Sequence, residues 1–153
     1  MQFSNGAQTI LDQFAADQGL RQLAFDEDGL IPIQLGEDLF IAVGYNPAND
    51  IFFFLSVIDP DGDSALPDPW WAFARNQELA ARRTRLAVEP TSKALMMIAD
   101  TLVSGLQFPD FTSRLDAFVA DVEKVRQAYG ELGAAGDGTD TLSALSNGDM
   151  IRV

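Results

Sequence analysis

Two consecutive apolar runs constrain the fold more than any other feature of this chain. Residues 39–44 and residues 51–58 are apolar at nearly every position, and a short polar turn separates them. Such turns join antiparallel strands, which usually have one apolar face and one polar face. Here Phe52 and Phe54 fall on one face, whereas Phe53 falls on the other together with Ile51, Leu55 and Val57. We therefore expect an antiparallel sheet with two apolar faces. Helices can cover one of them, and a second copy of the chain or a bound peptide is a candidate for part of the other.

The pattern along the chain predicts the order helix, three strands, helix, two strands, helix. Apolar residues recur at helical spacing over residues 7–18, and Gly19 followed by Leu20 is a helix stop signal. The alternation over residues 31–35 predicts a strand, which Pro32 restricts to an edge or a bulge because proline cannot donate a ladder hydrogen bond. The later elements are a helix that follows Pro69 and runs to about Leu79, strands over 85–89 and 94–101, and a long amphipathic helix from near Ser113 to Tyr129.

The predicted fold class is therefore α+β, an antiparallel sheet of about five strands with three helices. A chain of 153 residues fits one domain with a substantial core. After Gly130 the composition shifts to Gly, Ala, Asp, Thr and Ser with few large apolar residues. We expect a single domain over residues 1–130 and a flexible acidic tail over residues 131–153.

The charge of the chain limits its partners. The formal net charge is −13. Nucleic-acid binding depends on clustered basic residues that neutralise phosphates, so neither nucleic acid nor an anionic membrane surface is an expected partner. No segment has the pattern of a signal peptide, and none approaches the roughly 18 uninterrupted apolar residues of a membrane span. We expect a soluble cytoplasmic protein.

The residue types needed for most catalysis are missing. The chain has no histidine and no cysteine, which removes the commonest general base, the commonest transition-metal ligand and the thiolate nucleophile. It also lacks a phosphate-binding glycine loop, a nucleophile elbow and any metal-ligand spacing. We expect a binding protein rather than an enzyme, with no cofactor.

One acidic loop, Asp59-Pro60-Asp61-Gly62-Asp63-Ser64, has the composition of a calcium loop. An EF-hand needs its glycine after the third acidic position and a bidentate Glu at the twelfth. Gly62 comes two places early, and the twelfth position is Trp70. We interpret the loop as an ordinary solvated turn that binds no metal.

Three aromatic residues, Trp70, Trp71 and Phe73, lie within one helical turn. One narrow stripe of a helix cannot bury all three rings, so they either pack inside the chain or form the seam of a homodimer. Positive charge gathers just after them, at Arg75, Arg82, Arg83 and Arg85. These arginines either stabilise helix ends and form exposed ion pairs, or pair across subunits or with an acidic partner.

Several short segments carry a resemblance to a known family. They are Leu11 and Phe14 with Gly19-Leu20, Phe25-Asp26-Glu27-Asp28-Gly29 leading into Ile33, Arg75-Asn76, Leu86-Ala87-Val88-Glu89-Pro90, and Leu115 with Phe118. In this order the chain resembles class I type III secretion chaperones, the CesT/Tir-chaperone family, from Thr9 to about Tyr129. The resemblance implies a homodimer in the bacterial cytoplasm that binds the extended N-terminal segment of an effector without ATP and keeps it soluble and competent for export.

The resemblance also assigns residues to two surfaces. The client-binding residues that it implies are Leu20, Leu23, Phe25, Leu30 and Ile33. The dimer-interface residues that it implies are Trp70, Trp71, Phe73, Ala74, Leu86 and Met97. Two segments depart from the family pattern: residues 80–84, where a glycine-containing stretch is common, and the tail from Gly133.

Two other functions remain open at this stage. An acidic immunity protein would neutralise a basic nuclease toxin, because a charge of −13 would speed and orient that encounter. A carboxylate-based, metal-dependent hydrolase would use residues 59–63 and would lose activity on chelation. A chaperone-like fold that serves a different system is a further possibility.

Overall fold

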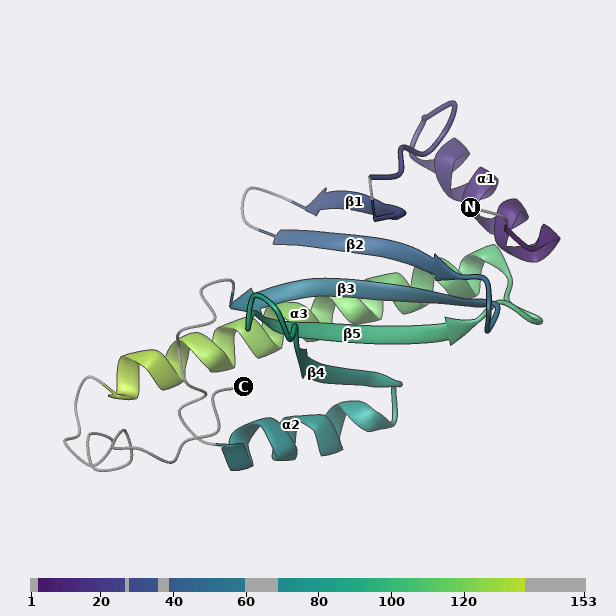
Figure 1. Cartoon of the computed structure of the whole chain (residues 1–153). Coiled ribbons are helices and arrows are strands. Elements are labelled where there is room, and N and C mark those ends of the chain that lie inside the picture. Colours follow the sequence, from purple (N-terminus) through teal and green to yellow (C-terminus); the bar gives the residue numbers. More distant parts are fainter. Residues whose placement is uncertain (1–2, 27, 36–38, 60–68, 137–153) are drawn as a thin grey trace. The chain divides into compact units, whose positions relative to one another are not determined.

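The computed structural model of the chain describes residues 3–26, 28–35, 39–59 and 69–136. These residues form three helices and one five-stranded antiparallel sheet in the strand order β1-β2-β3-β5-β4 (Figure 1). The elements are α1 (Asn5–Asp17), β1 (Leu30–Leu35), β2 (Leu39–Asn46), β3 (Ile51–Asp59), α2 (Pro69–Ala80), β4 (Thr84–Val88), β5 (Leu95–Leu102) and α3 (Phe108–Gly136). The α+β class and the predicted order of elements are confirmed, and β1 with its Pro32 is an edge strand.

The chain divides into two compact units. The first unit comprises residues 1–56 with 98–119, and the second comprises residues 57–97 with 120–153. Strands β3 and β5 and helix α3 each contribute residues to both units. None of the helices in the described part of the chain is both long and apolar enough to cross a lipid bilayer.

Helix α1 has a defined cap at each end. Ser4 is the N-cap, and its hydroxyl accepts a hydrogen bond of 3.2 Å from a backbone N–H of the first turn. At the other end Gly19 has a φ of +68°, in the left-handed region that favours glycine. Gly19 N donates to Ala16 O at 3.0 Å and Leu20 N donates to Ala15 O at 2.8 Å, the two bonds of a Schellman motif. The predicted stop signal is confirmed.

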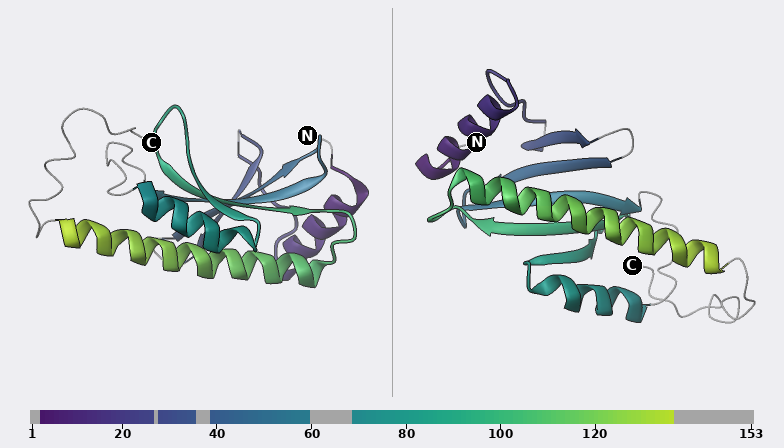
Figure 2. Two further views of the ribbon diagram at one scale, coloured as in Figure 1. Left: turned by 90° about the horizontal axis from the view of Figure 1, so that it is seen from below. Right: turned by 180° about the vertical axis from the view of Figure 1, so that it is seen from behind.

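The core of the first unit is built around one ring. Phe111, on the first turn of α3, is fully buried, and its ring centroid lies 5.2 Å from that of Phe52, 5.6 Å from Phe54 and 5.6 Å from Phe14. Phe118 lies seven residues, or about two helical turns, further along α3, and its ring centroid is 5.8 Å from that of Phe54. Within the first unit, the part of α3 up to Val119 lies along one face of the sheet (Figure 2). The apolar face predicted for Phe52 and Phe54 is therefore the covered one.

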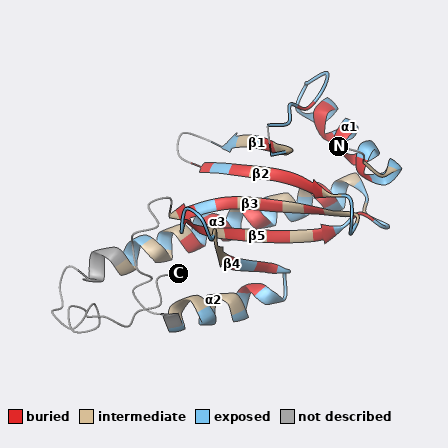
Figure 3. Cartoon of the chain, viewed as in Figure 1, coloured by how far each residue is buried: buried red, intermediate tan, exposed pale blue. Residues whose placement is uncertain are grey.

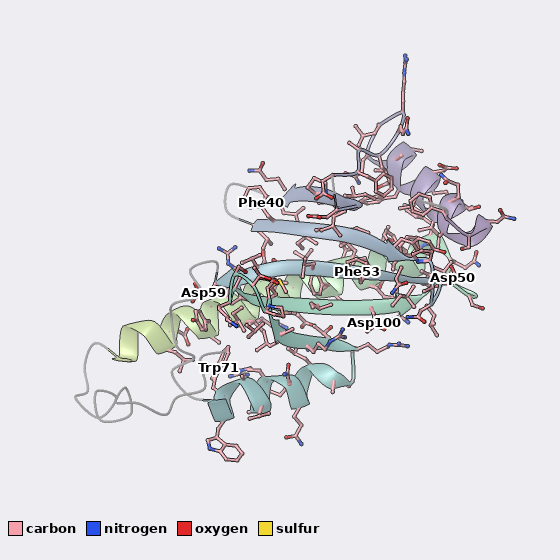
Figure 4. The ribbon with its side chains drawn as sticks, in the orientation of Figure 1. Phe40, Asp50, Phe53, Asp59, Trp71 and Asp100 are labelled. Carbon is pink, nitrogen blue, oxygen red and sulfur yellow. The ribbon has the colours of Figure 1, made fainter. Side chains whose placement is uncertain are left out.

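The opposite face of the sheet in the first unit is only partly covered. Phe53 and Leu55 on β3 are half-buried, whereas Phe40 on β2 and Leu102 at the end of β5 are 58% and 50% exposed (Figures 3 and 4). Phe53 pairs with Gly44 on β2, where an added Cβ would lie 2.1 Å from the phenyl ring. The ring thus occupies the space that the glycine leaves. This face exposes apolar side chains in a single copy of the chain, as the sequence predicted.

Helix α3 is longer than the sequence predicted at both ends. Pro109 lies in its first turn, where a missing N–H breaks no helical hydrogen bond, so the proline does not delay the start of the helix to Ser113. Gly130 lies inside the helix, because a glycine disfavours a helix by only about 1 kcal/mol and does not by itself end one. The helix therefore extends to Gly136, and the part of the predicted tail from residue 137 onward lies outside the described residues.

In the second unit α2 and α3 are joined through aromatic and polar contacts. Tyr129 of α3 donates a hydrogen bond of 2.6 Å to Asp59 Oδ2 at the end of β3, and its ring centroid lies 5.9 Å from that of Trp71 (Figure 4). Arg82 Nε lies 2.9 Å from Oδ2 of the buried Asp121, a charge contact without an aligned hydrogen bond.

Glu89 forms the hydrogen bonds that close the turn between β4 and β5. Lys93 N donates to Glu89 O at 2.8 Å and Glu89 N donates to Ala94 O at 3.0 Å, so the predicted hairpin is present. Backbone N–H groups of Ser92 and Thr91 donate to the carboxylate and lower the pKa of Glu89 from 4.5 to about 2. The ionised carboxylate therefore supports the turn.

Candidate functional site

The first unit contains a pocket between α1 and the segment that follows it. Its volume is about 120 Å³. The apolar lining includes Leu11 and Ala15 from α1 together with Leu23 and Phe25 from the following segment. The polar lining includes Asp12 and Arg21. With Gln8 and Gln22, four of the nine lining residues are polar, so the pocket offers both apolar and polar contacts to a ligand.

The structure brings together some of the predicted client-binding residues and separates others. Leu23 and Phe25 line the pocket, with Leu23 buried and Phe25 38% exposed. Leu20 is 52% exposed directly after the cap of α1. Leu30 and Ile33 lie three positions apart on β1, and successive side chains of a strand point to opposite faces. These two residues therefore do not share a face.

Phe3 is part of this pocket, and sequence patterns did not identify it. Its ring centroid lies 5.3 Å from that of Phe25 and 5.2 Å from that of Tyr45. The neighbouring Ser4 is fixed by a hydrogen bond from its hydroxyl to Asp50 Oδ1 at 2.7 Å, and Tyr45 OH donates to the same oxygen at 2.8 Å (Figure 4). Phe3 lies before the periodic part of α1, so no helical or strand pattern includes it.

The outer edge of β1 has few free backbone hydrogen-bonding groups with which another strand could pair. Leu30 N donates to Asp26 Oδ1 and Leu30 O accepts from Asp26 N, both at 2.8 Å, so the backbone of Leu30 faces away from β2. Alternation along an antiparallel strand makes Pro32 the next outward residue, and it has no N–H. Strand addition by an extended peptide at the middle of this edge therefore lacks a donor.

The edge of β4 in the second unit is closed by a side chain. Leu86 N donates to Asn76 Oδ1 at 2.6 Å, and Asn76 Nδ2 donates to Leu86 O at 3.3 Å. The side-chain amide of Asn76 on α2 thus pairs with both backbone groups of one edge residue, as a neighbouring strand would. Covering of this kind protects an edge strand from pairing with other chains.

Replacing Asn76 by alanine should lower the free energy of unfolding by about 1–2 kcal/mol, because a partly buried N–H and C=O would lose their partners. The matched control is Gln77→Ala, an exposed position on the same helix, for which we expect a change below about 0.5 kcal/mol. Urea unfolding followed by circular dichroism measures both values. Equal stability of the two variants would show that Asn76 does not support β4.

The residues predicted for the dimer interface differ in their exposure. Trp70 and Phe73 are 76% and 66% exposed, and their ring centroids lie 6.0 Å apart. The neighbouring Ala74 is also exposed. Trp71 is half-buried between Tyr129 and Arg75, whose guanidinium carbon lies 5.9 Å from the indole centroid. Leu86 and Met97 are buried within the chain. Trp70, Phe73 and Ala74 therefore form the accessible part of this set.

Two of the four clustered arginines form ion pairs within the chain. Arg75 Nη1 lies 2.6 Å from Glu78 Oε2, and Arg82 contacts Asp121. Arg83 and Arg85 also interact with other residues of the chain. Ion pairing within the chain thus accounts for Arg75 and Arg82.

Metal binding has no support in the described residues, which contain no group of three or more Asp or Glu side chains placed to hold an ion. Asp59 accepts the hydrogen bond from Tyr129. Residues 60–68, the rest of the acidic loop, lie outside the described part of the chain.

Comparisons with known proteins identify relatives of this fold. The model of the Tir chaperone protein (CesT) family matches residues 9–126. No curated protein sequence matches the chain significantly. Among solved structures, the ExsC–ExsE complex is similar with a TM-score of 0.65 and 16% identity, over 83% of this chain and 96% of that chain.

Two further solved structures have the same fold. The HopA1–SchA chaperone–effector complex gives a TM-score of 0.67 at 14% identity, over 80% of this chain and 94% of that chain. The ExoT–SpcS complex from Pseudomonas aeruginosa gives 0.54 at 15% identity, over 80% of this chain and 98% of that chain. At these identities the similarity concerns the fold.

Proposed function

Since the chain belongs to the Tir chaperone protein (CesT) family, we propose that it is a type III secretion chaperone. In this proposal it binds an extended N-terminal segment of a secreted effector in the bacterial cytoplasm and keeps that segment soluble and competent for export. The HopA1–SchA structure is a chaperone–effector complex of the same fold, which supports an effector as the partner. The proposed chaperone is not an enzyme and needs no cofactor.

The observation that carries the proposal is the family match over residues 9–126. Exposed large apolar side chains in the first unit offer surface that such a partner could cover. Leu20, Phe25 and Phe40 are 52%, 38% and 58% exposed. An unfolded client segment is a partner that could cover such surfaces.

We propose a homodimer as part of the same function. Trp70 and Phe73 on α2 supply the exposed aromatic pair, and aromatic residues are enriched at the centres of interfaces. The buried residues of the predicted set, Leu86 and Met97, would support the shape of that surface from within the chain. The body of each subunit would extend with α3 to Gly136, six residues beyond the boundary expected at residue 130, and the flexible tail would follow it.

The immunity-protein alternative depends on charge rather than on apolar surface. A net charge of −13 would favour a basic toxin, and that association would weaken strongly as salt rises. Family membership favours the chaperone. No observation on the described residues favours the metal-dependent hydrolase.

Replacing Phe25 by aspartate should weaken client binding by about 2 kcal/mol or more if the ring is a buried anchor in the complex, with the dimer intact. The matched control is Ala24→Asp, which adds the same charge at an exposed neighbouring position and keeps the ring. Isothermal titration calorimetry with the effector segment measures both. An unchanged affinity for Phe25→Asp would remove Phe25 from the client site.

The salt dependence of the binding affinity, measured in the same titrations, distinguishes the chaperone from the immunity protein. Raising salt from about 0.05 to about 0.5 M should change client affinity by less than about tenfold, because apolar burial is hardly screened. A loss much larger than tenfold would favour a partner held by surface charge.

A further inference from the structure

We propose that the C-terminal segment, residues 137–153, docks on α2 of its own subunit and covers the exposed Trp70–Phe73 pair. Leu142 and Leu145 supply the apolar contacts. The docked segment competes with the homodimer, because the dimer needs the same surface of α2. The contact itself does not depend on the proposed function, whereas the competition rests on the homodimer that is part of it.

The surface to be covered is the aromatic pair near the start of α2. Trp70 and Phe73 are 76% and 66% exposed, and their ring centroids lie 6.0 Å apart, so the two rings form one patch. Among the large apolar side chains of the described residues, these two are the most exposed. Aliphatic side chains that cover both rings would remove apolar surface from water, which is favourable.

The C-terminal segment begins close to this pair. The chain from residue 120 onward belongs to the same compact unit as α2, and the end of α3 and the start of α2 lie at the same end of that unit (Figures 1 and 2). The ring centroid of Tyr129 lies 5.9 Å from that of Trp71, and α3 rises by only about 10 Å from Tyr129 to Gly136. Leu142 follows six residues later, and six residues span up to about 20 Å. The segment is therefore long enough to return to α2.

The composition of the C-terminal segment favours a contact with the body of the chain. Small and polar residues dominate the segment, so it cannot form a core of its own. Leu142 and Leu145 are three positions apart, a spacing that places two side chains on the same face of a helical turn. The next large apolar residues, Met150 and Ile151, are adjacent in the sequence and provide a matched control.

The net charges of the two surfaces are complementary. Residues 75–93 contain five basic and two acidic residues, a formal charge of +3 within a chain of −13. Residues 137–153 contain three aspartates and one arginine, a formal charge of −2. Arg75 and Arg82 already form ion pairs, so the attraction comes from the net charge of the region rather than from an unpaired arginine. Opposite charge therefore favours docking of this segment beside α2.

Docking would regulate assembly. The proposed dimer buries Trp70 and Phe73 against a second copy of the chain, so each subunit must first release its own C-terminal segment. If the segment is docked in half of the free subunits, the apparent dissociation constant of the dimer rises about fourfold, because both subunits must be open at once.

Fluorescence on the full-length protein tests the contact. The chain has no cysteine, so Ser143→Cys accepts a single bimane label, whose emission tryptophan quenches on contact. At nanomolar concentration, which favours monomers, we expect quenching that Trp70→Phe largely removes. Leu142→Ser combined with Leu145→Ser should also relieve the quenching, because the apolar contact is lost.

A matched control separates this contact from a general effect of the segment. Met150→Ser combined with Ile151→Ser removes two large apolar residues from the same segment and should retain most of the quenching. Absence of quenching, quenching that Trp70→Phe leaves unchanged, or equal quenching in the two double variants would overturn the proposal.

Charge reversals test the complementarity. Asp140→Lys places a positive charge two residues before Leu142 and should reduce the quenching. Asp116→Lys makes the same change at an exposed position of α3 in the first unit and should leave the quenching unchanged. Equal effects of the two reversals would contradict a role for local charge in docking.

Sedimentation velocity on the unlabelled full-length variants tests the competition. The Leu142→Ser, Leu145→Ser variant should have a dimer dissociation constant about fourfold or more below that of the wild type, whereas the control variant should stay within about twofold. Equal dissociation constants for the two double variants would overturn the competition. A wild type and variants that are all monomeric at micromolar concentration would remove the homodimer and the competition with it.

The outcome for the proposed function is read separately, from co-purification of the chain with an effector. An effector complex without quenching in the free chain would remove this inference and leave the chaperone function in place. Quenching in a chain that binds no effector segment would support the contact and remove the chaperone function.

Discussion

Replacing Phe111 by alanine should lower the free energy of unfolding by about 4 kcal/mol, since buried Phe→Ala substitutions cost roughly 3–5 kcal/mol. The ring is fully buried and packs against Phe14, Phe52 and Phe54, which join α1 and β3 to α3. Whole domains are stable by only about 5–15 kcal/mol, so this variant should lose much of its stability margin. Urea unfolding followed by near-ultraviolet circular dichroism measures the change.

Phe40→Ala is the matched control for this substitution. Phe40 is 58% exposed, so removing its ring should lower the free energy of unfolding by less than about 1 kcal/mol. Similar losses for Phe111 and Phe40 would contradict the assignment of the covered and open faces of the sheet.

Replacing Trp70 by aspartate should convert the proposed dimer into monomers. The indole is 76% exposed in a single chain, and a symmetric dimer would bring two copies of it into the interface. A loss of about 2 kcal/mol at each copy corresponds to roughly a thousandfold increase in the dimer dissociation constant. Multi-angle light scattering at micromolar concentration measures the mass of the species.

Two other substitutions show whether the α2 surface is the seam. Phe40→Asp places the same charge on the open face of the sheet, and this variant should remain a dimer. If Phe40→Asp gave monomers while Trp70→Asp stayed dimeric, the dimer interface would lie on the sheet and not on α2. Trp71→Asp should instead destabilise the fold, because the Trp71 ring packs on Tyr129 within the chain. A wild-type protein that is a monomer at micromolar concentration would remove the dimer altogether.

Local pattern was enough to predict most of the fold. Strand alternation placed Phe52 and Phe54 on one face, and the Gly19-Leu20 pair identified the end of α1, because both signals depend on neighbouring residues. The ends of α3 were predicted wrongly. Pro109 and Gly130 resemble boundary signals locally, but a proline in the first turn and a single glycine inside a long helix are both tolerated.

The candidate site was less predictable, because it depends on contacts between distant residues. Phe3 reaches Tyr45 across the unit, and no periodicity links the two positions. Asn76 was part of the family resemblance, but its pairing with the backbone of Leu86 needs the placement of α2 beside β4. Leu30 and Ile33 were grouped by similarity to the family, although their odd spacing on β1 places them on opposite faces.

The most direct test of the central claim is to identify the protein that co-purifies with this chain from its native cell and to record the amide NMR spectrum of that partner within the complex. The chaperone account predicts a secreted effector whose bound N-terminal segment remains non-globular and stays bound at about 0.5 M salt. A folded basic nuclease that is released at that salt, with binding unaffected by Phe25→Asp, would contradict the account and favour an immunity protein.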